Sequence, residues 1–147
     1  MTAAGIPIGR LDPAETEAAV ALWQAAGLTR PWNDPRADIA AALACPTATI
    51  LAAREDGGGT GDRLVATVMA GFDGHRGWLY YLAVADDRRG QGLGRAMVAA
   101  AEAWLAAEGA PKVQLMIRAD NAAARGFYGR LGYEQSDVMV VGKRLDR

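Results

Sequence analysis

Apolar residues recur at helical spacing in four stretches of the chain. The first stretch follows Asp12-Pro13-Ala14-Glu15, which has the form of a capping box with proline at the first helical position. The second follows Asp34-Pro35, where the aspartate can cap the helix and the proline can occupy its first turn. The spacing predicts helices that begin near residues 13 and 35 and helices over residues 95–108 and 122–131.

Short runs of apolar and β-branched residues predict strands over residues 6–11, 47–54, 64–72, 78–84, 112–117, 133–136 and 137–145. The element order is β-α-α-β-β-β-α-β-α-β-β. Consecutive strands imply antiparallel pairing, whereas the strand–helix–strand unit over 78–117 implies a parallel neighbour. We therefore expect one α+β domain over residues 1–147, with a mixed, mostly antiparallel sheet of about seven strands and helices on both faces.

Composition narrows the classes of function. The net charge of −1 gives no field that favours nucleic acid or a membrane surface. The single Cys45 and single His75 predict neither an internal disulfide nor a metal site. Because no apolar run resembles a signal peptide or a membrane-spanning helix, we expect a cytoplasmic protein. Exposed closing strands are compatible with a homodimer.

A glycine-rich stretch, Arg88-Arg89-Gly90-Gln91-Gly92-Leu93-Gly94-Arg95, separates the strand over 78–84 from the next helix. Its glycines expose backbone N–H groups at a helix N-terminus, where the helix dipole also attracts anions. Three interpretations compete: a plain glycine turn, a dinucleotide fingerprint that fits the G-x-G-x-G spacing badly, and the pattern Arg-x-x-Gly-x-Gly. A Walker loop is excluded because no Gly-Lys-Ser/Thr occurs.

The third pattern, formed by Arg89, Gly92 and Gly94, resembles the acetyl-CoA pyrophosphate loop of the GNAT acetyltransferase superfamily. The segment over 121–134, NAAARGFYGRLGYE, is similar to that family's Asn-x-x-Ala-x-x-x-Tyr-x-x-x-Gly-Phe motif. The element order also agrees, so the resemblance covers nearly the whole chain and implies a three-layer α/β/α fold. Three shorter stretches, over 30–35, 73–77 and 142–145, resemble the bacterial YpeA subgroup, which identifies relatives without naming a substrate.

The resemblance implies an acyltransferase of the N-acetyltransferase type. In this family an amine attacks the thioester of acetyl-CoA directly, without an acyl-enzyme, so acetyl-CoA is the expected cosubstrate and no metal is expected. The pantetheine amides are expected on the strand that ends at Val84, and the pyrophosphate on the glycine loop. The residues expected to bind acetyl-CoA are Leu82, Ala83, Val84, Arg89, Gly90, Gln91, Gly92, Leu93, Gly94, Arg95, Asn121 and Tyr128.

The resemblance also suggests catalytic roles. Tyr128 is the expected general acid, since a phenol with a pKa of about 10 stays protonated at neutral pH and can donate to the CoA thiolate. Taken alone, Tyr128 would be interpreted as a tyrosine packed on the sheet. The backbone N–H of Leu82 is expected to stabilise the oxyanion. The base stays open among His75, which also fits a turn histidine, a water chain, and Asp73, Tyr80, Tyr81 and Glu134.

Trp32, Asn33, Tyr80 and Tyr81 are the candidates for binding the acceptor amine, although Trp32 also fits a tryptophan packed under its loop. The acids Asp34 and Asp137 in nearby loops would suit a cationic amine. The alternative function is a catalytically silent acyl-CoA-binding regulatory domain, against which Tyr128 favours catalysis. Left open are the acceptor (a small amine, a protein N-terminus or a lysine), the range of acyl groups and the oligomeric state.

Overall fold

The computed structural model describes residues 5–55 and 62–146. The chain divides into two compact units, Met1–Met116 and Ile117–Arg147. The first unit contains the sheet and the helices that cover it, and the second contains a shorter helix followed by an irregular C-terminal segment. The organisation of residues 1–147 as a single domain stays a prediction.

In the described part of the first unit, five strands form one sheet in the order β1-β2-β3-β4-β5. The first four strands pair antiparallel and β5 pairs parallel to β4, as the element order predicted. The strand β5 is shorter than the predicted strand over 112–117. The strands are β1 (Ile8–Arg10), β2 (Ala48–Arg54), β3 (Leu64–Phe72), β4 (Gly77–Val84) and β5 (Val113–Leu115).

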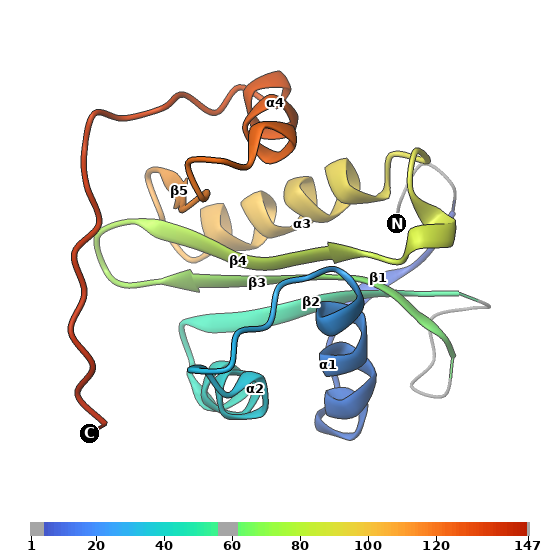
Figure 1. Ribbon diagram of the computed structural model, residues 1–147. Coiled ribbons are helices and arrows are strands. Elements are labelled where there is room, and N and C mark those ends of the chain that lie inside the picture. The colour runs from blue at the N-terminus through green and yellow to red at the C-terminus, as the bar shows by residue number, and fades with distance from the viewer. Residues whose placement is uncertain (1–4, 56–61, 147) are drawn as a thin grey trace. The chain divides into compact units, whose positions relative to one another are not determined.

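Helices cover both faces of this sheet (Figure 1). The helices α1 (Thr16–Ala25) and α2 (Pro35–Ala44) lie on one face, where α1 contacts β3 and β4 and α2 contacts β2. The helix α3 (Leu93–Ala107) lies on the other face, against β2, β3 and β4. A Cβ on Gly77 would lie 2.9 Å from Leu105 Cδ1, so this glycine allows α3 to approach β4 closely. The predicted α+β class is therefore confirmed.

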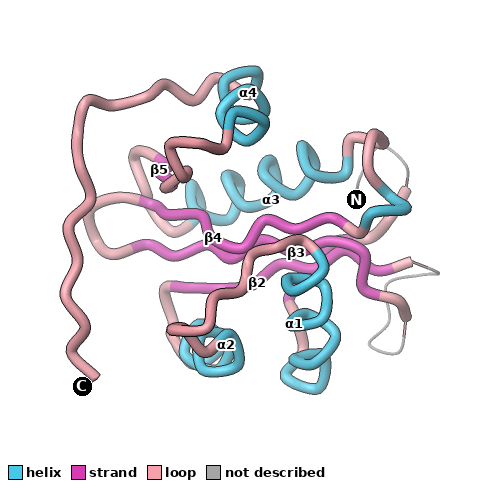
Figure 2. Tube along the Cα trace, in the orientation of Figure 1, coloured by secondary structure: helices cyan, strands magenta, loops and turns pink. Residues whose placement is uncertain are grey.

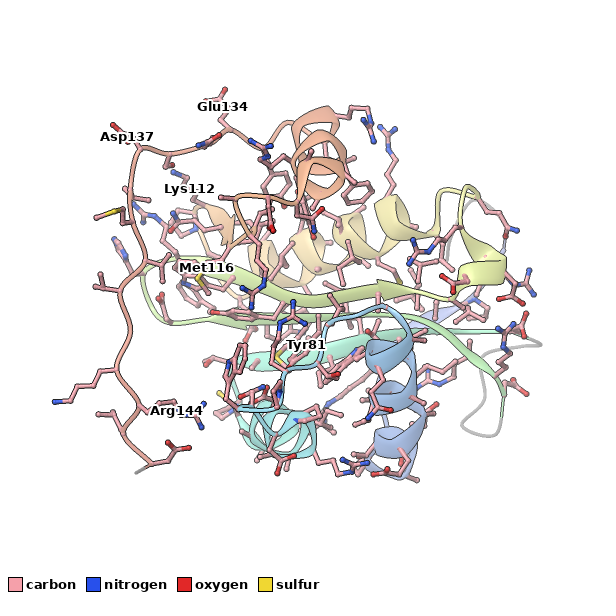
Figure 3. All side chains as sticks on the ribbon, in the orientation of Figure 1. Tyr81, Lys112, Met116, Glu134, Asp137 and Arg144 are labelled. Carbon is pink, nitrogen blue, oxygen red and sulfur yellow. The ribbon has the colours of Figure 1, made fainter. Side chains whose placement is uncertain are left out.

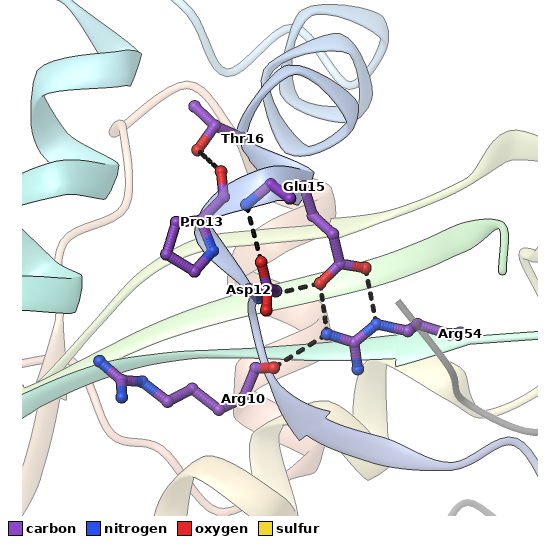
Figure 4. Close-up of polar contacts among 7 residues, drawn as sticks. Arg10, Asp12, Pro13, Glu15, Thr16 and Arg54 are labelled. Carbon is purple, nitrogen blue, oxygen red and sulfur yellow. Dashed lines mark hydrogen bonds and ion pairs between the residues drawn. The ribbon is translucent and has the colours of Figure 1, made fainter. Parts of the chain in front are cut away.

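The predicted capping box before α1 is confirmed and has a second role. A short 3-10 turn, η1 (Pro13–Glu15), follows Asp12, and the Glu15 carboxylate accepts a hydrogen bond from the Asp12 N–H at 2.9 Å. The same carboxylate accepts two hydrogen bonds from Arg54 of β2, at 2.5 and 2.7 Å (Figure 4). Both residues are only 5% exposed, so a buried ion pair fastens the start of α1 to the sheet.

The second unit contains the helix α4 (Ala122–Arg130). The side chain of Asn121 caps it by accepting a hydrogen bond from the Ala124 N–H at 3.0 Å, and Gly132 follows its end with a φ of +92°. These two boundaries agree with the predicted helix over 122–131.

The predicted strands over 133–136 and 137–145 are wrong. Among the described residues the chain after α4 forms no strand, as the loop colouring of Figure 2 shows. The Val138–Val141 side chains are 68–89% exposed. β-branched residues favour extended backbone, but a strand forms only where a partner strand supplies its hydrogen bonds, and no ladder pairs with this segment. The predicted count of about seven strands is therefore too high by the two closing strands.

Candidate functional site

The middle of β4 departs from regular pairing with β3. One extra residue of β4 lies between its pairs with Thr67 and Met69, so Tyr81 and Leu82 oppose the single residue Val68. Tyr81 has a φ of +54°, the one positive φ among the described non-glycine residues. This is a β-bulge with a strained residue, a conformation that persists only where the surrounding structure enforces it.

Side chains from three elements and one loop hold Tyr81 in this conformation. Its ring stacks on Trp23 of α1, with centroids 3.7 Å apart. The hydroxyl of Thr67 donates to the Tyr81 carbonyl at 3.0 Å and accepts from Trp23 Nε1 at 2.8 Å. The Tyr81 hydroxyl donates to Asp38 Oδ2 of α2 at 2.6 Å, and Asn33 Nδ2 donates to that oxygen at 2.7 Å and to the Tyr81 hydroxyl at 3.0 Å. The bulge is therefore fixed by packing and by a satisfied polar network.

A pocket of about 390 Å³ lies beside this network. Its wall comes from α2 and from the strands β2, β3 and β4, and Figure 3 labels Tyr81 on the side of the sheet that α1 and α2 cover. Most of the lining is apolar and much of it consists of small side chains, which leave the space open. The lining residues are Asp38, Ala41, Ala42, Ala48, Met69, Ala70, Gly71, Tyr80 and Tyr81.

The two tyrosines of the pocket stay protonated at neutral pH. Burial, followed by the hydrogen bond to Asp38 and the charge of that carboxylate, raises the pKa of Tyr81 well above its ordinary value. Burial and the charge of Asp73 also raise the pKa of Tyr80. Neither phenol therefore supplies a phenolate base near pH 7, and both serve as hydrogen-bond donors there.

The turn between β3 and β4 contains two further candidates for the base. Asp73 accepts hydrogen bonds from the N–H groups of Arg76 and His75 at 2.7 and 2.8 Å, and these bonds hold the pKa of its carboxyl below the usual value. Asp73 also accepts from Trp78 Nε1 at 3.1 Å. His75 is exposed in this turn and is not part of the pocket wall. Asp73 therefore forms the turn by satisfying local N–H groups.

The glycine-rich stretch connects β4 to α3 through the 3-10 turn η2 (Asp86–Arg88). Gly90 and Gly92 have φ values of +77° and +78°, a region that residues with a Cβ rarely adopt. Gly92 is the N-cap of α3 and its first turn receives no side-chain hydrogen bond. The first N–H groups of α3, from Leu93 to Arg95, are thus available to an anion at the positive end of the helix dipole.

Two arginines of this stretch already have acidic partners. Arg88 pairs with Glu55 at the end of β2, and Arg89 pairs with Asp86 at 3.1 Å. Gln91 and Arg95, by contrast, are exposed on the loop and on the first turn of α3. The sequence predicted arginine charge beside the loop, and these ion pairs show that part of this charge is neutralised within the protein.

In the second unit, Tyr128 belongs to an aromatic cluster on α4. Its ring makes edge contacts with Phe127 and Tyr133, at centroid distances of 5.0 and 5.5 Å. Burial raises the pKa of Tyr128 to about 12. The phenol therefore keeps its proton across the whole neutral range, which a proton donor requires.

The structure brings together three of the four residues predicted to bind the acceptor. Tyr80 and Tyr81 line the pocket, and Asn33 is bonded to Tyr81. Trp32 is 57% exposed and does not line the pocket. Asp38, which also lines the pocket, was not among the residues predicted to bind the acceptor, because it lies one helical turn after the Asp34 cap and could be taken as a second capping acid. The signal in the sequence that could have indicated this pocket was the group of alanines that follows Asp38 at helical spacing.

Neither a metal nor a membrane signal is present in residues 5–55 and 62–146. These residues contain no group of three or more His, Cys, Asp or Glu side chains placed to hold a metal ion. None of the helices within the same residues combines the length and apolar composition needed to traverse a bilayer.

The sequence of this chain is similar to those of known acetyltransferases. Residues 17–133 match the model of the acetyltransferase (GNAT) family. An acetyltransferase from Pectobacterium atrosepticum is 44% identical over 129 residues, which cover 88% of each chain.

Two solved structures share the fold at 16% identity. One is AAC(6')-Iy in complex with the bisubstrate analogue CoA-S-monomethyl-acetylneamine, with a TM-score of 0.77 over 95% of this chain and 97% of that one. The other is the aminoglycoside antibiotic 6'-N-acetyltransferase AAC(6')-IG from Acinetobacter haemolyticus, with a TM-score of 0.75 over 95% of this chain and 98% of that one. The chain is therefore an acyltransferase that belongs to the acetyltransferase (GNAT) family.

Proposed function

We propose that the protein transfers the acetyl group of acetyl-CoA to a primary amine by direct attack on the thioester. The observation that carries the proposal is the bulged strand β4, followed by the glycine-rich loop and an N-terminus of α3 without a side-chain cap. Together they offer strand backbone for an amide-bearing arm and N–H groups for a pyrophosphate. The CoA-based analogue bound to AAC(6')-Iy supports the choice of cosubstrate.

In this proposal the acetyl-CoA site extends along β4 and the loop. Leu82, Ala83 and Val84 pair with the pantetheine amides, and Asn121 contacts the cosubstrate from its cap position. The pyrophosphate accepts hydrogen bonds from the loop and from the first turn of α3, where Arg88 and Arg89 must exchange their acidic partners if they are to contact it. The loop residues assigned to this site are Arg89, Gly90, Gln91, Gly92, Leu93, Gly94 and Arg95.

The chemical step follows from the groups available. The amine nitrogen attacks the thioester carbonyl carbon, and the Leu82 N–H donates to the oxyanion that forms. The C–S bond then breaks, and Tyr128 donates a proton to the thiolate. The amine loses its proton to a base, for which His75, Asp73, Glu134 or a water chain stay as proposals, while Tyr80 and Tyr81 in their protonated state fit donor roles better.

The alternative of a catalytically silent regulatory domain gains nothing from the comparisons, because the relative at 44% identity is named an acetyltransferase. The YpeA subgroup, the cytoplasmic location and the homodimer remain predictions.

The test of this proposal is release of free CoA thiol from acetyl-CoA in the presence of a panel of primary amines. We expect thiol release that depends on both the amine and the enzyme, with mass spectrometry showing a gain of one acetyl group on the amine. Tertiary amines of similar size serve as controls, since they cannot form a stable amide. Thiol release at the same rate without any amine, or none with the whole panel, would contradict the proposal.

A further inference from the structure

The pocket against α2 contains one carboxylate that has no cationic partner. Asp38 takes part in none of the ion pairs formed by the described residues, and both groups that donate to it are neutral. Both donors, the Asn33 amide and the Tyr81 hydroxyl, bond to Oδ2, so Oδ1 receives no hydrogen bond from residues 5–55 or 62–146. A carboxylate beside an apolar surface is stabilised most strongly by a cation that bonds to its free oxygen.

The rest of the pocket suits a slender apolar group. Five of its lining residues are alanine or glycine, and Met69 with the rings of Tyr80 and Tyr81 forms the remaining wall. A volume of about 390 Å³ is near the small end of the range for ligand sites, which is about 300–1,000 Å³. The site therefore combines room for one short carbon arm with one negative charge.

We propose that this pocket binds a primary ammonium group at the end of a short alkyl arm, with the ammonium on Asp38 and the arm along the apolar wall. The proposal rests on the proposed function, for which this group belongs to the acceptor. A free alkylamine and the side chain of a lysine share this chemistry. Asn33 and Tyr81 act as positioning residues, because their hydrogen bonds to Oδ2 fix the orientation of the carboxylate and leave Oδ1 for the ligand.

Direct binding measurements test the pocket without any turnover. We would titrate the protein with n-butylamine and with its neutral counterpart 1-butanol by calorimetry, in the absence of acetyl-CoA. We expect n-butylamine to bind about tenfold or more tightly than 1-butanol, because a hydrogen bond to a charged group contributes more than one to a neutral group. Nα-acetyl-lysine methylamide is titrated in a parallel experiment. Tighter binding of n-butylamine would identify a free alkylamine as the ligand, and tighter binding of the lysine derivative would identify a lysine side chain.

The variant Asp38→Asn isolates the charge, since its side-chain carbonyl can still accept from Tyr81. We expect it to weaken n-butylamine binding about 10- to 100-fold and to leave 1-butanol binding within about threefold. The matched control is Asp34→Asn, which removes the same charge from the same helix at a cap position that asparagine also fills and that does not line the pocket. Unchanged amine binding in Asp38→Asn, or equal losses in both variants, would overturn the proposal.

A second variant protects the test if Asp38→Asn folds poorly. Ala41 is exposed at the pocket, so Ala41→Leu adds bulk there and leaves the charge of Asp38 in place, and we expect it to weaken the binding of both ligands. Failure of the two proposals is distinguishable. Amine binding that depends on Asp38 in a protein without acetyl transfer would contradict only the proposed function, whereas acetyl transfer with an amine KM unaffected by Asp38→Asn would contradict only the pocket.

Discussion

Replacing Glu15 by alanine is expected to lower the free energy of unfolding by about 3–5 kcal/mol. The change leaves the Arg54 guanidinium, which is 5% exposed, without its two hydrogen bonds to a carboxylate. It also removes one half of the capping box, because the Asp12 N–H loses its acceptor (Figure 4). Urea unfolding followed by circular dichroism measures the loss.

The control is Glu17→Ala, which removes an equally well-formed pair that is exposed. Arg36 donates two hydrogen bonds of 2.7 Å to Glu17, but the two side chains are 53% and 70% exposed. Water and salt screen such a pair, so we expect a much smaller loss than in Glu15→Ala. Equal losses in the two variants would show that burial does not determine the contribution of the Glu15–Arg54 pair.

The same pair should make stability depend on pH. The hydrogen bonds from Arg54 lower the pKa of Glu15 below its ordinary value of 4.5. The unfolded state therefore binds the proton first as pH falls, so this contribution is complete above pH 4.5 and is lost as pH falls through the lower folded-state pKa. In Glu15→Gln the decrease in stability below pH 4.5 should be smaller than in the unaltered protein.

Replacing Tyr128 by phenylalanine is expected to lower kcat by about 10²- to 10⁴-fold, the range usual for loss of a general acid. The CoA thiolate then leaves without a proton donor. With a pKa of about 12 the phenol is fully protonated at neutral pH, so its loss removes a donor that is always available. The dissociation constant of acetyl-CoA should change only a few-fold, since the ring remains. Steady-state thiol release and calorimetry separate the two effects.

Tyr133→Phe is the matched control, because it removes a hydroxyl from the ring that packs edge-on against Tyr128. We expect its kcat to stay within about threefold of the unaltered protein, since Tyr133 is not the expected proton donor to the thiolate. If Tyr128→Phe keeps the same kcat as Tyr133→Phe, the phenol has a packing role and another group protonates the thiolate.

The order of elements was predictable because local signals agree with the tertiary structure. Asp12 and Asp34 are each followed by a proline at the start of a helix, and both aspartates cap as expected. The closing strands were not predictable in the same way. The run Val138–Val141 contains three β-branched valines and so indicates a preference for extended backbone, but it contains no information about a partner strand. The burial of Glu15 was also hidden, since its partner Arg54 is 39 residues away in the sequence.

The candidate site also has one part that the sequence predicted and another part that it did not. The glycine loop could be located from the sequence because Gly90 and Gly92 adopt backbone conformations that favour glycine. The bulge at Tyr81 could not, because it depends on Thr67, Trp23 and Asp38, which come from separate parts of the chain. A carboxylate such as Asp38 becomes a candidate for ligand binding only when folding places it in a pocket without a cation.

Thermal unfolding with acetyl-CoA, CoA, NAD and ATP in parallel tests the central claim most directly, since a ligand that binds only the folded state must raise the midpoint. At a hundredfold excess over its dissociation constant such a ligand adds about 2.7 kcal/mol of stability, or about 5–10 °C for a chain of this size. We predict this shift with acetyl-CoA and CoA alone. A shift with NAD or ATP instead, or no shift with either CoA species, would contradict the assignment of the loop after β4 as an acetyl-CoA site.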